Sequence, residues 1–519
     1  MATPSEKLAE SLELLQKLQR RDGAAAIRAR DLSRTHRERL LANGYLREII
    51  KGWYIAGRPE EAKGESTPWY AAFWRFCAGY LNERFGSEWC LSPEQSLSLH
   101  GGNWSVPRQL LVRSPKARNK VTEFPHGTSL LDVRAALPTA GDMEQKGGMR
   151  VFSLEAALVG CSPGYFSQNA TDMRAALAMV RDGVGMLARL LEGGHTKVAG
   201  RLAGAFRNIG RERIADDIVK TMTSAGYDVR ENDPFADRPG PVLARRETSP
   251  YVNRIRLLWK KMRGPVMDRF PAAPGLPGDR GAYMKHVDDV YVTDAYHSLS
   301  IEGYRVTPAL IERVRSGKWN PDADGQDREQ RNALAARGYW QAYKAVEKSV
   351  GRVLRGANAG DIADEDHGTW YREMFAPSVT AGLLKPAELA GYRNGQVYIR
   401  HSMHVPLDRE AVRDAMPAFF DLLRKEEDPA VRIVLGHFIF VYIHPYMDGN
   451  GRIGRFLMNV MLAAGGYPWT VVPLERRDPY MAALEEASVR QNIVPFADFL
   501  AQLVNEGLRG KPVAKVPAG

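Results

Sequence analysis

The chain has 519 residues, of which 44% are hydrophobic and 26% charged, a composition typical of a globular protein with several domains. Its net charge of +11 is compatible with nucleic acid or with an anionic ligand, but an average over the chain does not choose between them. The apolar stretch 438–443 is far shorter than the roughly 20 residues of a membrane span. The first 21 residues lack the apolar core of a signal peptide, so we expect a cytoplasmic protein without a membrane partner.

The first 60 residues predict a small helical unit that ends in a hairpin. Apolar residues at helical spacing favour a helix over 6–20, and short helices fit 24–30 and 35–42. Residues 45–55 then read as two short strands around Lys51-Gly52. Three helices and a hairpin are typical of a winged helix-turn-helix, whose basic residues would contact DNA. The candidate DNA-binding residues are Arg34, Arg37, Arg39 and Lys51.

The rest of the chain divides where its composition changes. Residues 61–235 predict a mixed α/β region, with a strand in 104–114 and a long helix over 169–192. A Pro- and Asp-rich stretch begins near residue 231, and we assign 236–284 to a linker with helical segments. From 285 to 510 the pattern is helical, so the predicted fold class is mainly α.

A single loop, HPYMDGNGRIGR at 444–455, carries six polar functions in twelve residues. It stands between the apolar segments 431–443 and 456–466, which predict two buried helices. Such helices would give a reactive loop a rigid base. A Gly-rich turn without chemical function is the alternative, and the number of polar functions disfavours it.

The residue types in this loop suit phosphoryl or nucleotidyl transfer. His444 can accept a proton from a hydroxyl near neutral pH, and Asp448 offers a hard oxygen ligand for Mg²⁺ shared with phosphates. Backbone N–H groups at the start of a helix favour an anion, and neighbouring arginines add fixed positive charge. The candidate anion-binding residues are Gly449, Asn450, Gly451, Arg452 and Arg455.

This loop resembles the motif of the Fic family, His-Pro-Phe-x-(Asp/Glu)-Gly-Asn-Gly-Arg-x-x-Arg, with Tyr446 in place of the usual Phe. The resemblance extends over about 285–510 and implies a helical Fic domain that transfers AMP from ATP to a Ser, Thr or Tyr hydroxyl of a protein. It implies that His444 is the base and that Asp448 binds Mg²⁺. It also implies that the glycine turn holds the phosphates and that Arg455 contacts the γ-phosphate.

Two further strings resemble parts of the same family. Residues 391–406, GYRNGQVYIRHSMHVP, look like its β-hairpin flap. The alternation at Val397, Tyr398 and Ile399 suits an edge strand that docks an extended segment of the target protein. Tyr480 stands where the family places an aromatic side chain near the adenine, with packing in the core as an equal alternative.

The string SLSIEG at 298–303 ends an expected helix over 288–303 and resembles the inhibitory pattern (Ser/Thr)-x-x-x-Glu-(Gly/Asn) of Fic proteins. Its defined positions are Ser298, Glu302 and Gly303. The resemblance implies that Glu302 pairs with Arg455 and removes the charge that receives the γ-phosphate. A solvated Glu at a helix end is the alternative. Some relatives with this pattern dimerise or remove AMP, so a homodimer and AMP removal both stay open.

Residues 44–57, GYLREIIKGWYIAG, resemble the wing of AbiEi-type antitoxins, which implies DNA binding and a toxin–antitoxin context. Two functions of different classes follow. The first is a protein adenylyltransferase that is autoinhibited by Glu302 and modifies an unknown target protein or itself. The second is a DNA-binding transcriptional regulator in which the Fic part serves as a sensor. The complete loop 444–455 favours the enzyme.

Overall fold

The computed structural model describes residues 3–22, 26–57, 59, 65–237, 249–317, 327–511 and 514–516. The chain forms two compact units, the first comprising 1–254 with 398–405 and the second 255–397 with 406–519. Helices dominate both, which confirms the mainly α class. The boundaries predicted near 60, 235 and 284 stay predictions, and 238–248 of the predicted linker lie outside the described residues. No helix within the described ranges is long and apolar enough to cross a membrane.

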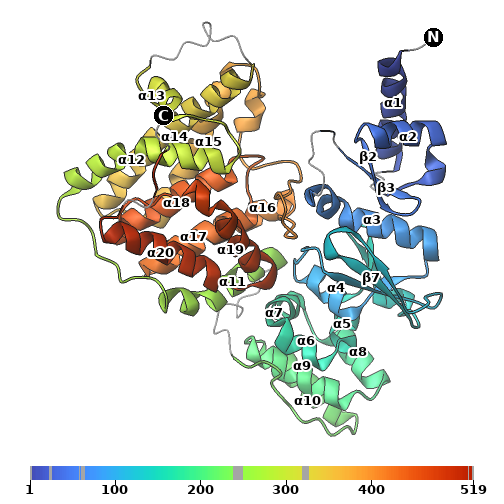
Figure 1. Cartoon of the computed structure of the whole chain (residues 1–519). Coiled ribbons are helices and arrows are strands. Elements are labelled where there is room, and N and C mark those ends of the chain that lie inside the picture. Colours follow the sequence, from blue (N-terminus) through green and yellow to red (C-terminus); the bar gives the residue numbers. More distant parts are fainter. Residues whose placement is uncertain are drawn as a thin grey trace. The chain divides into compact units, whose positions relative to one another are not determined.

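The N-terminal part of the first unit packs helices against a small antiparallel sheet of order β1-β3-β2 (Figure 1). Its elements are α1 (Pro4–Asp22), β1 (Ile27–Arg28), α2 (Arg34–Ala42), β2 (Leu46–Ile50) and β3 (Trp53–Ala56). The predicted hairpin around Lys51-Gly52 and the helix expected over 35–42 are therefore confirmed. Leu15, Leu40 and Leu46 lie in the core of this part.

The short helix expected over 24–30 is wrong in the part that is described. Ile27 is 1% exposed and pairs with Tyr54 of β3, so burial of its side chain favours an extended backbone. Residues Ala29–Asp31 then form a 3₁₀ turn. The Asp31 carboxylate closes this turn by accepting a hydrogen bond from the Arg28 N–H at 2.8 Å.

The remainder of the first unit combines a four-stranded sheet of order β4-β5-β7-β6, a β8–β9 hairpin and helices. The strands are β4 (Cys90–Leu91), β5 (Gln109–Ser114), β6 (Lys120–Glu123), β7 (Ser129–Arg134), β8 (Met143–Lys146) and β9 (Met149–Phe152). The helices are α3 (Thr67–Phe85), α4 (Pro93–His100), α5 (Leu154–Gly160), α6 (Pro163–Gln168), α7 (Ala170–Met179), α8 (Val184–Glu192), α9 (Thr196–Asn208) and α10 (Glu212–Ser224), with 3₁₀ turns at Pro125–Gly127 and Ala140–Asp142. Strands β5 and β7 are parallel.

The long helix expected over 169–192 is divided into α7 and α8. The division falls at residues 180–183, between the end of α7 at Met179 and the start of α8 at Val184. There the Asp182 carboxylate accepts a hydrogen bond from the N–H of Val184, the first residue of α8, at 3.1 Å. The helical periodicity of the two segments conceals this interruption.

The second unit is a helical bundle around α17 (Pro429–Ile443) and α18 (Asn450–Gly465), which confirms the two buried helices predicted beside the loop (Figure 1). Its other helices are α11 (Pro250–Met267), which begins in the first unit, α12 (Arg280–Ile301), α13 (Pro308–Arg315), α14 (Asp327–Leu354), α15 (Ala359–Thr380), α16 (Arg409–Lys425), α19 (Arg477–Arg490) and α20 (Val494–Leu508), with 3₁₀ turns at Pro386–Leu389 and Leu474–Arg476. Helix α18 packs against α17, α14 and α15, and α12 packs against α14.

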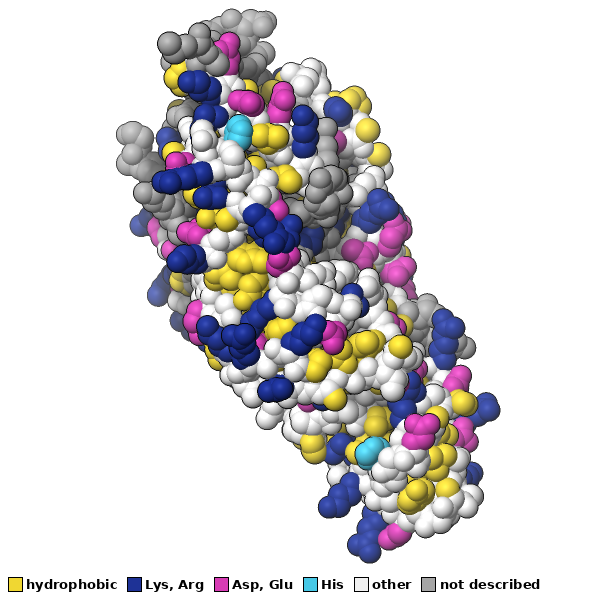
Figure 2. All heavy atoms as spheres, turned by 90° about the vertical axis from the view of Figure 1, so that its right-hand side faces the viewer, with side chains coloured by type: hydrophobic (Ala, Val, Ile, Leu, Met, Phe, Trp, Pro, Cys, Tyr) yellow, Lys and Arg dark blue, Asp and Glu magenta, His cyan; other side chains and the backbone are white. Residues whose placement is uncertain are grey.

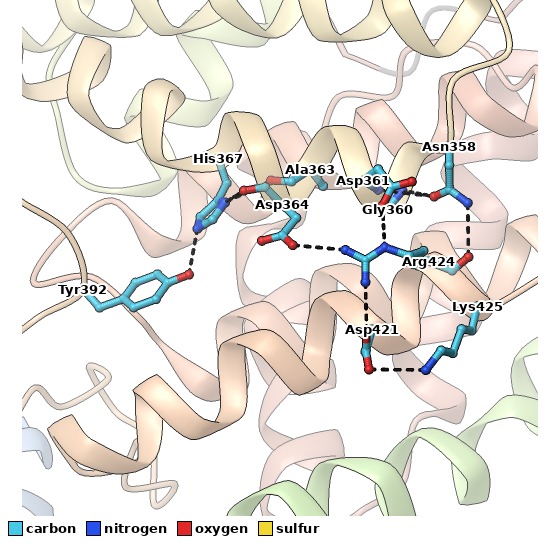
Figure 3. A network of polar contacts seen from close by, with 10 residues as sticks. All are labelled: Asn358, Gly360, Asp361, Ala363, Asp364, His367, Tyr392, Asp421, Arg424 and Lys425. Carbon is cyan, nitrogen blue, oxygen red and sulfur yellow. Dashed lines mark hydrogen bonds and ion pairs between the residues drawn. The ribbon is translucent and has the colours of Figure 1, made fainter.

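An ion-pair network joins α15 to α16 (Figure 3). Arg424 of α16 contacts Asp361 and, at 3.2 Å, Asp364, both on the first turns of α15. Further along α15, His367 Nε2 lies 3.0 Å from the Tyr392 hydroxyl. These contacts fix the position of α15, which contributes the aromatic side chains that surround the candidate active site.

A buried ion pair gives a test of this fold. Arg254 of α11 pairs with Asp172 of α7, each residue is 1% exposed, and Asp172 also accepts bonds from Ser98 at 3.1 Å and Asn103 at 2.9 Å. Arg254→Met leaves a buried carboxylate without its countercharge. We therefore expect the free energy of unfolding, measured by hydrogen exchange at the amides of α7, to fall by roughly 3–5 kcal/mol. The control Arg213→Met, with a side chain 95% exposed, should change it by less than about 0.5 kcal/mol. An equally small loss in Arg254→Met would contradict the prediction.

Candidate active site

The loop between α17 and α18 is held in one conformation by its own residues. His444 follows α17 in the left-handed region (φ 56°, ψ 61°), and Gly449 precedes α18 at φ 81°. The Asn450 side chain, 2% exposed, accepts a hydrogen bond from the Tyr446 N–H at 2.9 Å and donates one to the Tyr446 carbonyl at 2.8 Å. The Asn450 amide group therefore shapes the loop, which leaves only its backbone for the phosphate contact predicted from the sequence.

Tyr446 anchors this loop in a cluster of aromatic rings. It is 1% exposed, and its ring stacks on that of Tyr371 at 3.9 Å with an interplanar angle of 5°. The rings of Tyr392 and His367 lie 5.9 and 6.3 Å away. Tyr446 therefore packs inward, and the replacement of Phe by Tyr leaves the anchor intact.

The His444 ring is oriented by one hydrogen bond. Its Nδ1 lies 3.1 Å from the Val441 carbonyl oxygen. A carbonyl only accepts hydrogen bonds, so Nδ1 carries the proton and the opposite nitrogen, Nε2, can accept one. Burial lowers the pKa of His444 to about 4, and the positive charge of Arg393 acts in the same direction. The imidazole is therefore a neutral base at physiological pH.

Arg393 fixes the backbone of the loop, a role that the sequence did not indicate. Its Nε donates to the His444 carbonyl at 2.7 Å, and its backbone N–H donates to the Pro445 carbonyl at 2.9 Å. Its other guanidinium nitrogens bind the carbonyls of Gly395, at 2.9 Å, and Leu407. All these acceptors are backbone carbonyls, which any residue type supplies, so no motif marks the contact.

The β-hairpin flap predicted for residues 391–406 is wrong, because the segment contains no β-strand. Side chains bridge its two arms in place of a backbone ladder: Arg393 binds carbonyls on both arms, and Gln396 Nε2 donates to the Pro406 carbonyl at 2.8 Å. The tip, 398–405, belongs to the first unit. The target-docking role proposed for three residues of this segment stays a prediction: Val397, Tyr398 and Ile399.

Two buried arginines of α18 have N–H groups for which the described residues provide no hydrogen-bond acceptor. Arg452 is 1% exposed, and its guanidinium carbon lies 5.2 Å from the ring centroids of both Tyr304 and Phe375. Its Nε and Nη2 donate no hydrogen bond, although Nη2 forms a 3.4 Å ion pair with the exposed Asp448 carboxylate. Nη1 of Arg455, which is 3% exposed, also donates none to the described residues. Buried charged donors without acceptors are costly. The two side chains therefore fit an anionic ligand such as a polyphosphate.

Asp448 fits a magnesium ion that is shared with phosphates. Its side chain is 65% exposed, and one carboxylate oxygen lies 3.4 Å from Arg452 Nη2. Within the described ranges, no group of three or more His, Cys, Asp or Glu side chains is placed to hold a metal ion. A single carboxylate holds Mg²⁺ when phosphate oxygens and water complete the shell, so the metal site and the nucleotide site would be one.

Glu302 lies just beyond the end of α12, and Gly303 follows in the left-handed region at φ 87°. Arg455 Nη2 donates to the Glu302 carboxylate at 2.8 Å and to the Ser298 carbonyl at 3.0 Å, and Arg455 Nε donates to the Ser298 hydroxyl at 2.9 Å. Burial disfavours the charge of Arg455, but Glu302 more than compensates and raises the pKa of the guanidinium. The structure thus brings together the residues of the two separate sequence patterns.

Glycine at position 451 makes room for this carboxylate. A Cβ atom at Gly451 would lie 2.4 Å from Glu302 Oε1, so a larger residue would displace it. Gly451 is in the first turn of α18, where the helix dipole and free N–H groups favour negative charge. Glu302 therefore lies beside the position where the sequence predicts a phosphate.

Tyr480 lies in the core. It is 1% exposed, its hydroxyl lies 2.7 Å from His437 Nε2, and its ring is 6.1 and 5.8 Å from the rings of Phe496 and Phe499. Tyr480 thus packs in the core, and its contact with adenine stays a prediction.

The residues predicted to bind DNA differ in their surroundings. Arg34 and Lys51 are exposed, and Arg34 pairs with Glu38 at 2.7 Å. Arg37 instead donates to the Ala29 carbonyl at 2.8 Å, and Arg39 donates to the Lys7 carbonyl and the Ser11 hydroxyl at 2.6 and 2.8 Å. On the face drawn in Figure 2, Lys and Arg side chains lie interspersed with acidic and hydrophobic ones. DNA binding stays a prediction.

A cavity of about 520 Å³ adjoins the pair of Glu302 and Arg455. The residues lining it are Glu302, Gly303, Tyr304, Arg305, Arg331, Asn332 and Asp448. Arg305 and Arg331 belong to neither sequence pattern, and no periodicity or spacing in the sequence places them beside Asp448.

Residues 368–462 match the model of the Fic/DOC family. The Protein adenylyltransferase Fic of Drosophila willistoni is 30% identical over 224 residues, which are 42% of this chain and 41% of the relative. The Protein adenylyltransferase Fic of Nematostella vectensis is 27% identical over 264 residues, which are 50% of this chain and 57% of the relative. The chain thus spans about half the length of these curated relatives. Fic-1 from C. elegans, a solved structure, is 20% identical over 66% of this chain and 95% of that chain, with a TM-score of 0.37, too low to support an inference. The region of the chain that matches the Fic/DOC family includes the loop from His444 to Arg455 and thus the candidate active site.

Proposed function

We propose that this protein transfers AMP from ATP to a hydroxyl group of a protein and that Glu302 holds it in an inactive state. The observation that carries the proposal is the hydrogen-bonded ion pair of Glu302 and Arg455, which joins an inhibitory pattern to a complete Fic loop. The names of the curated relatives, Protein adenylyltransferase, support the same reaction. An unidentified protein or the chain itself is the proposed acceptor.

In this reaction His444 Nε2 accepts the proton of the acceptor hydroxyl as the hydroxyl oxygen attacks the α-phosphorus of ATP. The bond from this phosphorus to the bridging oxygen of the β-phosphate breaks, and pyrophosphate leaves. The orientation of the His444 ring and its neutral state support this role. Asp448 would hold Mg²⁺, whose charge neutralises the phosphates, and the first turn of α18 together with Arg452 would bind the transferred group.

Glu302 inhibits AMP transfer through its negative charge. Arg455 is buried and Glu302 compensates its charge, so a γ-phosphate would have to compete with a carboxylate already in place. Transfer then requires Glu302 to withdraw, after which the unpaired arginine favours binding of the terminal phosphate. The Glu302 side chain is 26% exposed and lies at the end of a helix, so it can move without unpacking the core.

Removal of AMP from a modified protein is a second candidate. Glu302 lies against the first turn of α18, where its carboxylate could orient a water molecule toward the phosphorus of a bound AMP ester. Water would then take the place of the protein oxygen, which leaves as a hydroxyl. In this case Glu302 would be required rather than inhibitory, so one substitution separates the two functions.

The first prediction from the proposed function concerns inhibition by Glu302. In the presence of Mg²⁺ and α-labelled ATP, Glu302→Gly should incorporate label into protein at least about tenfold faster than the natural chain, because loss of one charged hydrogen bond corresponds to roughly 1.5–3 kcal/mol. Glu302→Gln, which keeps the size and loses the charge, should give an intermediate rate. Label is followed on the chain itself and on the proteins of an added lysate.

The matched control for this experiment is Glu302→Gly/His444→Ala, which should lose the label while it retains ATP binding. If Glu302→Gly shows no label although it binds ATP, the transfer proposal is wrong. Loss of label from a previously modified protein, in the natural chain and not in Glu302→Gly, would instead favour AMP removal.

The second prediction concerns pH. His444 must be unprotonated to act as the base, and its lowered pKa of about 4 keeps it so down to acidic pH. At saturating ATP, kcat of Glu302→Gly should therefore change by less than about twofold between pH 7.5 and 6 and fall only as the pH approaches 4. A profile that is half-maximal near pH 6.5, the ordinary value for His, would contradict this role of burial.

A further inference from the structure

We propose that the cavity beside Glu302 is the subsite for the β- and γ-phosphates of ATP, which leave as pyrophosphate, and that Arg305 and Arg331 supply its positive charge. This inference rests on AMP transfer as the proposed function. It concerns residues outside the Fic loop and outside the inhibitory pattern. The volume of about 520 Å³ lies within the roughly 300–1,000 Å³ that is usual for small-molecule sites.

The backbone at Arg305 is fixed although its side chain is exposed. The chain turns at Gly303, with φ 87°, and the Tyr304 N–H donates to the Leu299 carbonyl at 3.1 Å. The Arg305 N–H donates to the Asn332 side chain at 3.2 Å, which ties it to α14, and the next residue, Val306, is 6% exposed. Arg305 is thus carried on the wall of the cavity, three residues after the inhibitory Glu302.

Arg331 is coupled to the Fic loop through aromatic rings. Its guanidinium carbon lies 5.9 Å from the ring centroid of Tyr304, and that of Arg452 lies 5.2 Å from the same ring. Phe375 contacts Arg452 in turn, also at 5.2 Å. Cation–π contacts of this kind hold an arginine near a ring while its N–H groups stay available to a ligand. One connected set of side chains therefore links the loop to the cavity.

The net charge of the cavity depends on the position of the Glu302 side chain. Among the described residues of the lining, Arg305 and Arg331 are balanced by two carboxylates, Glu302 and Asp448, so these four side chains carry no net charge while Glu302 is in place. Withdrawal of Glu302 leaves one net positive charge, and Mg²⁺ at Asp448 would add to it. The same movement would release Arg455 and turn the cavity into a site for a polyanion.

Binding of nucleotides tests this inference without any need for transfer. In the Glu302→Gly background and with Mg²⁺, calorimetry compares ATP, pyrophosphate and AMP on proteins with and without Arg305→Ala/Arg331→Ala. We expect the dissociation constants of ATP and pyrophosphate to rise at least about tenfold, since two charged contacts are lost, and that of AMP to stay within about twofold. Arg305→Lys/Arg331→Lys should restore a large part of the affinity for pyrophosphate.

The control Arg355→Ala removes an exposed arginine just beyond the other end of α14 and should change none of the three constants. Unchanged binding of ATP and pyrophosphate in the double variant would overturn the proposal of the subsite. If Glu302→Gly nevertheless transfers AMP, the proposed function would stand. An equal loss for AMP would also overturn the subsite, because AMP lacks the β- and γ-phosphates. If none of the three ligands binds any protein, both proposals fail.

Discussion

The ion pair between Arg455 and Glu302 is the interaction on which the candidate site depends. Arg455 is 3% exposed, so its charge must be compensated within the protein or by a ligand. Glu302 and Ser298 provide this compensation from the end of α12. The charge of Arg455 is thus compensated in this structure, and a proposed active arrangement would need an anion near Arg455 in place of Glu302.

The remainder of the loop is held by several contacts, so the proposed regulation requires the movement of one side chain, Glu302. Asn450 satisfies both backbone groups of Tyr446, the Tyr446 ring is stacked on Tyr371, and Arg393 holds the His444 carbonyl. The base therefore needs no rearrangement before catalysis. The absence of a side chain at Gly451 then decides how closely a carboxylate or a phosphate approaches α18.

The sequence predicted the parts of the site that lie in short, defined patterns. It placed His444, Asp448 and Arg455 in one loop between two buried helices, and it paired Glu302 with Arg455 across more than 150 residues because each belongs to a recognisable motif. The predicted helix ending in the inhibitory pattern is present as the later part of α12. These features follow from local residue types and periodicity.

Features set by tertiary contacts were missed. The segment 391–406 alternates like a hairpin, but the Arg393 and Gln396 side chains occupy the space between its arms. In the described part of the helix expected over 24–30, Ile27–Arg28 form a strand because Ile27 is buried against β3, and a 3₁₀ turn follows. The cavity containing Arg305 and Arg331 is formed where α14 approaches the end of α12, and no sequence pattern encodes that approach.

A double-mutant cycle on the ion pair tests the central claim most directly. Hydrogen exchange at the amides of Ser300, Ile301 and Glu302 would give the free energy of opening the end of α12 in the natural chain, Glu302→Gln, Arg455→Met and the double variant, all without nucleotide. If the pair holds the inactive state, each single substitution lowers this free energy and the double substitution lowers it little further, with a coupling of about 1 kcal/mol or more. Additive effects, with a coupling near zero, would contradict the claim.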